Sequence, residues 1–148
     1  MAHDASDSLP LEFSLGYQIR ATHRVFQRTL QTRIERYGVT LGMWYFLRVL
    51  WSEDGITQSE LSQRVGTMEP TTLSAIRDME RSGFVRRVPH PEDRRKINIY
   101  LTEEGQALRD KLLPSAVAVI EAASAGLTSR EITMMLDVLK AIQRNLQE

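Results

Sequence analysis

Six basic side chains lie between residues 81 and 96, and together they can bind the phosphates of a nucleic acid. They are Arg81, Arg86, Arg87, Arg94, Arg95 and Lys96. Only Glu92 and Asp93 oppose them, so six positive charges minus two negative charges leave this segment at +4. The whole chain has 148 residues with 19 basic and 19 acidic side chains, and its neutral total therefore hides a local basic patch. An aspartate can hold a neighbouring arginine in a bidentate pair, and an arginine presented in this way can enter a narrow minor groove.

Other kinds of chemistry find little support in the residue types. The chain has no cysteine, which excludes disulfides, thiolate zinc sites and thiol nucleophiles. Its three histidines, His3, His23 and His90, lack the spacing of metal ligands, so we expect no metal site. The sequence shows no Ser–His–Asp set and no glycine-rich phosphate loop, so we expect neither an enzyme nor a cofactor.

The elements around the basic patch follow the order helix, helix, hairpin. The capping box from Thr57 to Glu60 predicts a short helix over 58–64, and Pro70 suits the start of a second helix that runs to Arg81. Alternating apolar residues predict strands over 84–88 and 97–101, joined by the polar turn PHPEDRRK. Two short helices followed by a two-stranded hairpin are the order of a winged helix-turn-helix, so we expect a mostly α fold of this class.

The second short helix is the expected recognition helix. Its predicted inner residues are Leu73, Ile76, Met79 and Glu80, and its predicted outer residues are Thr71, Thr72, Ser74, Ala75 and Arg77. Small hydroxyl side chains permit close approach to the floor of a major groove, and Arg77 can reach a guanine edge or a phosphate. We therefore expect DNA contacts from Thr71, Thr72, Ser74 and Arg77 on this helix, and from Asp93, Arg94, Arg95 and Lys96 at the hairpin tip.

Long helices flank the predicted DNA-binding lobe. Apolar residues at steps of three and four run from Leu11 to Tyr37, and Gly38 ends that helix. A helix over 41–51 follows Thr40, and because it is apolar on nearly all sides we expect it to be a central core element. Two further helices begin at Thr102 and at the capping box from Thr128 to Glu131. One copy offers too little surface to bury the apolar stripes of both terminal helices, so we expect a homodimer. We divide the chain into a flexible tail over 1–10, a helical dimerisation region over 11–38 and 102–148, and a winged helix-turn-helix domain over 39–101.

The stretch from Thr57 to Gly105 resembles the DNA-binding domain of MarR-family transcriptional regulators. Its most specific part is Asp93-Arg94-Arg95 followed by alternating apolar residues and Leu101-Thr102-Glu103-Glu104-Gly105. The resemblance implies a homodimeric repressor or activator, of which we expect the repressor, that binds pseudo-palindromic double-stranded DNA. It also implies that Arg94 or Arg95 enters the minor groove and that Asp93 orients it. Ser74 stands where many members carry an arginine, so the operator sequence of a relative cannot be transferred.

The resemblance further implies a small ligand, often an aromatic acid, that weakens DNA binding. Cations beside aromatic walls suit a planar carboxylate or its thioester, and Arg20, His23 and Trp44 are the candidates for such a pocket.

A winged helix can instead serve as a protein-interaction module without sequence-specific DNA binding. The charged hairpin tip favours DNA, because a wing that docks on protein tends to be apolar. No apolar run reaches the length of a membrane span and the N-terminus is polar, so we expect no membrane partner and a cytoplasmic location.

Overall fold

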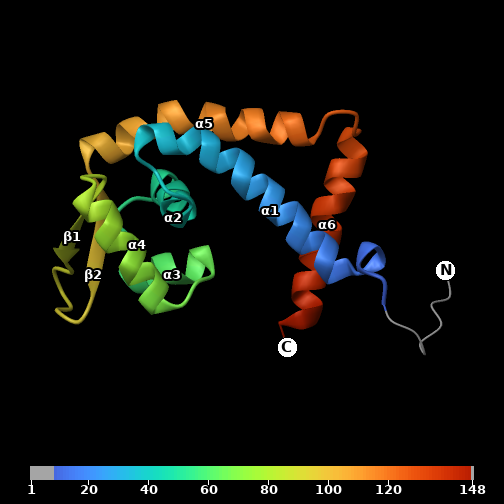
Figure 1. The fold of residues 1–148 in the computed structure, drawn as a ribbon. Coiled ribbons are helices and arrows are strands. Elements are labelled where there is room, and N and C mark those ends of the chain that lie inside the picture. The colour runs from blue at the N-terminus through green and yellow to red at the C-terminus, as the bar shows by residue number, and fades with distance from the viewer. Residues whose placement is uncertain (1–8, 148) are drawn as a thin grey trace.

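The computed structural model describes residues 9–147 and confirms the predicted mostly α winged helix-turn-helix with a two-stranded hairpin (Figure 1). Its elements in order are η1 (Leu11–Phe13), α1 (Leu15–Ile34), η2 (Glu35–Tyr37), α2 (Leu41–Ser52), α3 (Gln58–Val65), α4 (Glu69–Arg81), β1 (Val85–Pro89), β2 (Ile97–Leu101), α5 (Glu103–Ala123) and α6 (Ser129–Leu146). The expected flexible tail over 1–10 lies outside the described residues except for Leu9 and Pro10.

The first predicted helix, over 11–37, is three elements rather than one. A short 3₁₀ turn ends at Ser14, whose extended backbone (φ −79°, ψ 117°) and hydroxyl, which accepts from the Tyr17 N–H, make it the N-cap of α1. The apolar spacing continues across Ser14, so periodicity alone does not reveal this break. At the other end Gly38 adopts φ 77° and ends η2, as predicted.

We call α2 to β2 together with the first half of α5 the lobe. Its core forms around α2, which contributes the buried side chains Met43, Trp44, Phe46, Leu47 and Leu50. Every other element of the lobe adds at least one buried apolar residue, among them Leu61 from α3, Ile76 and Met79 from α4, Val85 from β1, Ile99 from β2, and Leu108 and Leu112 from α5. Each such side chain contributes about 1.5–3 kcal/mol on transfer from water. The prediction that the apolar helix over 41–51 is a central core element is confirmed.

The base of the hairpin is bonded to the loop that precedes α3. β1 and β2 pair antiparallel from Val85↔Leu101 to Pro89↔Ile97. The Gly55 N–H donates to the Ile99 carbonyl (3.0 Å), the Ile99 N–H donates to Ile56 (2.9 Å), and the Asp54 carboxylate accepts from the Leu101 N–H (2.8 Å). These bonds fix the hairpin relative to α3, which begins three residues after Gly55.

α5 joins the lobe through a close backbone contact at Gly105. A Cβ atom on Gly105 would lie 2.1 Å from the carbonyl oxygen of Phe84, so only glycine fits there. The Gly105 N–H donates to the Thr102 hydroxyl, which caps α5, and the Gly105 carbonyl accepts from Trp51 Nε1 at 2.9 Å. The start of α5 is thereby anchored to both the hairpin and α2.

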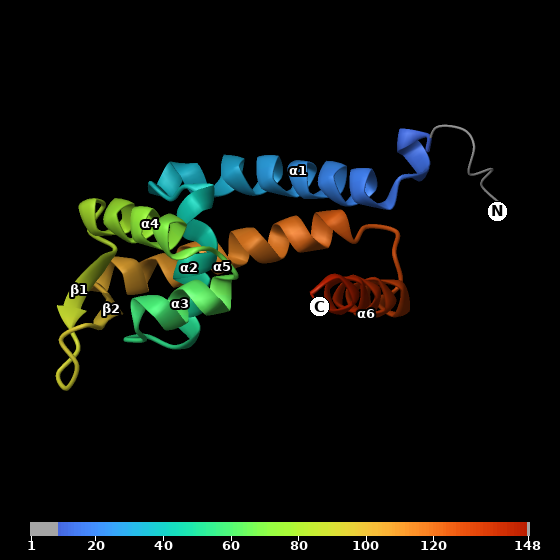
Figure 2. The same cartoon turned by 90° about the horizontal axis from the view of Figure 1, so that it is seen from below.

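Outside the lobe the helices bury little within one chain. α5 and α1 lead away from the lobe to α6, which stands apart from it in both ribbon views (Figures 1 and 2). α6 has no buried residue, and its exposed apolar side chains include Met134, Met135, Leu136 and Val138. No helix within residues 9–147 is long and apolar enough to cross a membrane.

We predict that Gly105→Ala lowers the free energy of unfolding by about 1–3 kcal/mol, because the added methyl group overlaps the Phe84 backbone. The measurement is urea denaturation followed by circular dichroism. Gly16→Ala in α1 is the control, since an added Cβ there meets nothing within 4 Å and alanine favours a helix. Equal midpoints for Gly105→Ala and the parent chain would contradict the proposed steric role.

Candidate nucleic-acid interface

Three hydroxyl groups fix the junction between α3 and α4. The Thr72 hydroxyl lies 2.7 Å from the Ser62 hydroxyl and 2.8 Å from the Thr67 hydroxyl. Thr72 is 0% exposed, so it cannot contact DNA, and the prediction that it faces outward is wrong. Its side chain instead satisfies polar groups that the tight turn after Gly66 brings together, which sets the position of α4 relative to α3.

The outer face of α4 presents Thr71, Ser74 and Arg77, all three exposed as predicted. Two neighbours differ from the prediction: Ala75 is buried, and Glu80 is exposed rather than inward. A shallow hollow of about 390 Å³ lies between this face and Gly42 at the start of α2. The small side chains of Thr71 and Ser74 line it, so another surface can approach the α4 backbone closely.

The hairpin tip holds one arginine in a fixed geometry. The Asp93 carboxylate accepts from Arg95 Nε (3.2 Å), from Arg95 Nη2 (3.3 Å) and from the Arg95 backbone N–H (3.0 Å). These hydrogen bonds hold the pKa of the Asp93 carboxyl below its ordinary value, so the pair persists at neutral pH. The side chain of Arg95 is nevertheless 91% exposed, against 27% for Asp93. Asp93 therefore orients Arg95, whereas Arg94 forms no ion pair within residues 9–147.

His90 is a tip residue that the sequence analysis considered only as a metal ligand. Its Nδ1 atom accepts the backbone N–H groups of Glu92 and Asp93, each at 3.1 Å. The only signal in the sequence is the position of His90 between two prolines, where few backbone N–H groups are available.

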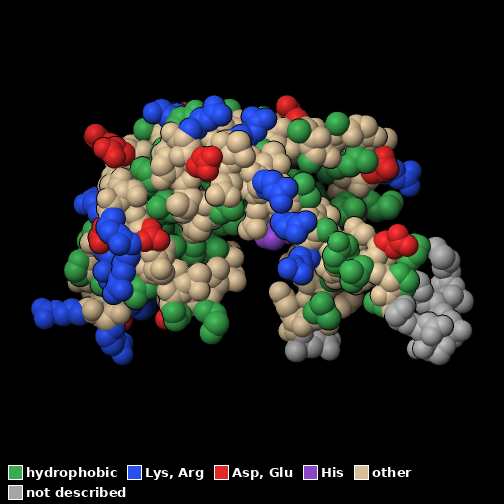
Figure 3. Space-filling model, in the orientation of Figure 1, with side chains coloured by type: hydrophobic (Ala, Val, Ile, Leu, Met, Phe, Trp, Pro, Cys, Tyr) green, Lys and Arg blue, Asp and Glu red, His purple; other side chains and the backbone are tan. Residues whose placement is uncertain are grey.

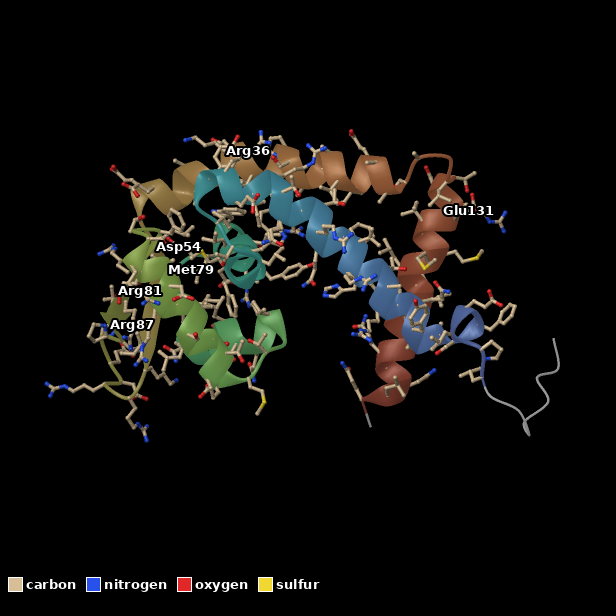
Figure 4. All side chains as sticks on the ribbon, viewed as in Figure 1. Arg36, Asp54, Met79, Arg81, Arg87 and Glu131 are labelled. Atoms are coloured by element: carbon tan, nitrogen blue, oxygen red, sulfur yellow. The ribbon has the colours of Figure 1, made fainter. Side chains whose placement is uncertain are left out.

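Basic side chains extend from the tip across the adjoining face. Figure 3 shows a dense group of Lys and Arg side chains over the end of the molecule formed by α4 and the hairpin, and Figure 4 places Arg81 and Arg87 there. Arg86 lies over the Tyr100 ring, with its guanidinium carbon 5.4 Å from the ring centroid. The hairpin tip projects beyond α3 and α4 (Figure 2). A polar helix face and a projecting basic tip are together suited to a long, negatively charged partner.

The structure does not bring together the three candidates for a ligand pocket. Trp44 is 2% exposed and packs edge-to-face on Trp51 at 5.9 Å, so it is a core residue and not the wall of an open pocket. Arg20 and His23 are exposed on α1, where their ligand role stays a prediction.

α1 as a whole is basic, a feature that was not among the predicted site features. From Leu15 to Ile34 the helix carries Arg20, Arg24, Arg28 and Arg33 and no acidic residue. An open groove of about 530 Å³ lies where the end of α1 and η2 meet α5, and its lining includes Arg28, Arg33, Arg36 and Ser115. None of these arginines forms an ion pair with another described residue, so the groove offers free cations to an anion.

Comparisons with known proteins agree with this architecture. The model of the MarR family matches residues 39–97. The crystal structure of a MarR transcriptional regulator from Methanosarcina mazei Go1 is 30% identical, has a TM-score of 0.80, and covers 88% of this chain and 94% of that one. The homoprotocatechuate degradative operon repressor of Escherichia coli is 29% identical over 118 residues, which are 78% of this chain and 80% of that protein. The Staphylococcus aureus MepR–DNA complex shares the fold, with 22% identity, a TM-score of 0.85, and coverage of 90% and 99%.

We predict that Thr72→Val lowers the free energy of unfolding by about 1–3 kcal/mol, because it removes the buried hydroxyl that bonds to both the Ser62 and the Thr67 hydroxyl. Thr71→Val is the matched control: the same substitution at an exposed neighbour should change stability by less than about 0.5 kcal/mol. Thermal and chemical denaturation of both variants test this. Equal effects at the two positions would contradict the structural role of Thr72.

Proposed function

Because the chain belongs to the MarR family, we propose that it is a homodimeric repressor that binds a pseudo-palindromic DNA operator and releases it when a small anionic ligand binds. The observation that carries the proposal is the Asp93–Arg95 pair at the tip of a wing beside the exposed polar face of α4. The name of the Escherichia coli relative supports the repressor role. Since the proposed partner is chromosomal DNA, we infer that the protein acts in the cytoplasm and not as an enzyme.

In this proposal α4 enters the major groove and the wing lies along the minor groove. Thr71 and Ser74 allow close approach, and Arg77 contacts a base edge or a phosphate. Arg95 enters the minor groove, because the carboxylate of Asp93 already holds its guanidinium in one orientation and less side-chain freedom is lost on binding. Arg94 and Lys96 are exposed beside it and contact phosphates.

The exposed apolar side chains of the terminal helices support a dimer. Leu11, Phe13, Leu15 and Ile19 are each at least 39% exposed, and five apolar residues of α6 are each at least 48% exposed: Met134, Met135, Leu136, Val138 and Leu146. Exposed apolar side chains that gather on neighbouring helices are typical of an interaction surface, and a second copy would cover them. A two-fold dimer presents two recognition helices to two half-sites about 34–36 Å apart, which matches a palindromic operator.

The arginines of α1 support an anionic ligand of the aromatic carboxylate or thioester class. Figure 3 shows basic side chains following α1 along the edge of a hollow between the lobe and the α6 end. The predicted ligand contacts Arg20 and His23 are exposed on the same helix. The groove of Arg28, Arg33 and Arg36 is a second location with the same chemistry. A ligand that binds more tightly to a spacing of the lobes unsuited to DNA shifts the population away from the operator-bound state.

We predict that Arg95→Ala weakens binding to an operator duplex by about 10-fold or more and that Arg94→Ala has a smaller effect. The measurement is fluorescence anisotropy with duplex DNA from immediately upstream of the protein's own coding region, titrated with salt and compared with a scrambled duplex. Arg109→Ala, at an exposed position of α5 that belongs to neither α4 nor the wing, is the control for loss of a positive charge.

Salt-sensitive preference for the upstream duplex is the expected result for the parent chain, because phosphate contacts release counterions. Equal or absent binding of both duplexes would overturn the DNA-binding proposal in favour of a protein-interaction module. Parent-like binding by both arginine variants would overturn only the role of the wing.

We predict that the double substitution Arg33→Ala and Arg36→Ala raises about 10-fold the concentration of benzoate or benzoyl-coenzyme A that releases the operator duplex, with operator affinity unchanged. Arg20→Ala tests the other location in the same competition assay. If only Arg20→Ala raises the releasing concentration, the ligand site lies at Arg20 on α1 and not in the groove. If neither probe releases the duplex at saturation, this ligand class is ruled out.

A further inference from the structure

We propose that His90 is a positioning residue for DNA recognition: its imidazole Nδ1 atom closes the turn at the wing tip and so places Asp93 where its carboxylate can orient Arg95. This inference rests on the proposed function, because its consequence for recognition depends on a wing that binds DNA.

A single acceptor atom serves two backbone donors. Nδ1 of His90 accepts from the N–H groups two and three residues later, Glu92 and Asp93, both at 3.1 Å. Side-chain oxygens of Ser, Thr, Asp and Asn satisfy the same N–H positions at helix N-caps and in Asx turns. For Nδ1 to accept, the ring must be neutral with its hydrogen on Nε2. His90 thus does with a ring nitrogen what these shorter polar side chains do with oxygen.

Asp93 is the centre of the bonds that this turn supports. Its N–H donates to His90, its backbone carbonyl accepts from the Lys96 N–H at 3.0 Å, and its carboxylate receives Arg95. The His90 N–H donates in turn to the Lys96 carbonyl at 3.0 Å. Removal of the Nδ1 acceptor leaves the N–H of Asp93 without its protein partner and frees one end of the residue that holds Arg95.

The tip is ordered by hydrogen bonds and not by apolar packing. Every side chain from Pro91 to Lys96 is exposed except Asp93, which is half-buried, as is His90. With no buried apolar side chain in this segment, its conformation depends on hydrogen bonds. Pro91 contributes no N–H, so the two donors that His90 accepts are the first ones available in the turn.

An acceptor without negative charge at position 90 also leaves the positive charge of the tip unchanged. Three basic residues minus two acidic residues give the segment from His90 to Lys96 a net charge of +1. An aspartate at position 90 could accept the same hydrogen bonds, but it would cancel this charge. Asparagine is therefore the conservative replacement, because its Oδ1 atom lies as many bonds from the backbone as Nδ1 does and carries no charge.

Three variants test the proposal with the anisotropy assay described above. His90→Ala removes the acceptor, His90→Gln moves the same amide group one methylene too far, and His90→Asn keeps an acceptor in place. We expect about 3- to 10-fold weaker operator binding for His90→Ala and His90→Gln, the range that corresponds to one or two hydrogen bonds. Binding by His90→Asn should stay within about 2-fold of the parent. Thermal unfolding should be the same in all three, since the tip lies outside the core.

A double-variant cycle tests whether His90 acts through Arg95. If it does, His90→Ala adds little to the loss already caused by Arg95→Ala. Full additivity of the two losses, parent-like binding by His90→Ala, or an Asn variant as weak as the Ala variant would each overturn the positioning role.

A measurement without DNA separates this inference from the proposed function. Hydrogen exchange of the Glu92 and Asp93 N–H groups should be faster in His90→Ala and His90→Gln than in the parent, and restored in His90→Asn. Unchanged exchange in His90→Ala would overturn the role of Nδ1 even if the parent binds its operator. If the exchange pattern is as expected but the parent prefers neither duplex, the role of Nδ1 in the turn stands. Its role in recognition then fails together with the proposed function.

Discussion

The contact between Gly105 and the Phe84 backbone is the constraint on which the arrangement of the whole molecule depends. It brings the first turn of α5 against the residue that precedes β1, at a separation that no side chain could occupy. Trp51 and Thr102 then bond the same turn to α2 and to the Gly83 carbonyl. The lobe and its long exit helix are thereby one body, so the direction of α5 determines where α4 and the wing point. In the proposed dimer, the packing of α5 against the second copy would therefore determine the distance between the two α4 helices.

Within the lobe, small polar contacts have the same role as the apolar core. The hydroxyl groups of Ser62, Thr67 and Thr72 hold α4 against α3, and the Asp54 carboxylate holds β2 against the loop before α3. Each of these contacts lies on the inner side of an element, α4 or the wing, whose outer side presents hydroxyl or charged groups. The exposed residues can therefore suit a partner without having to stabilise the fold, because buried neighbours position the backbone that carries them.

Local signals in the sequence predicted most of the fold. The caps at Thr57, Thr102 and Thr128 and the turn glycines act within a few residues, so their pattern is visible in the chain itself. Thr72 could not be placed correctly in this way, because its partners come from α3 and from the turn. The same holds for Trp44, whose aromatic ring suggested a binding wall but packs on Trp51. The choice of Arg95 over Arg94 as the partner of Asp93 required the conformation of the tip, which depends on backbone hydrogen bonds that residue types do not show.

In the proposed dimer, the isolation of α6 links the concentration of the protein to its folded state. Within the described residues this 18-residue helix buries no side chain and makes no extensive contact with another element. Most of the stability of a helix in a protein comes from the packing of its apolar face rather than from its backbone alone. In the proposed dimer the second copy supplies that packing, so association and the ordering of α6 form one equilibrium, and dilution opposes both. The number of copies in a cell would set the fraction of chains with an ordered C-terminal helix as well as the fraction of operators occupied.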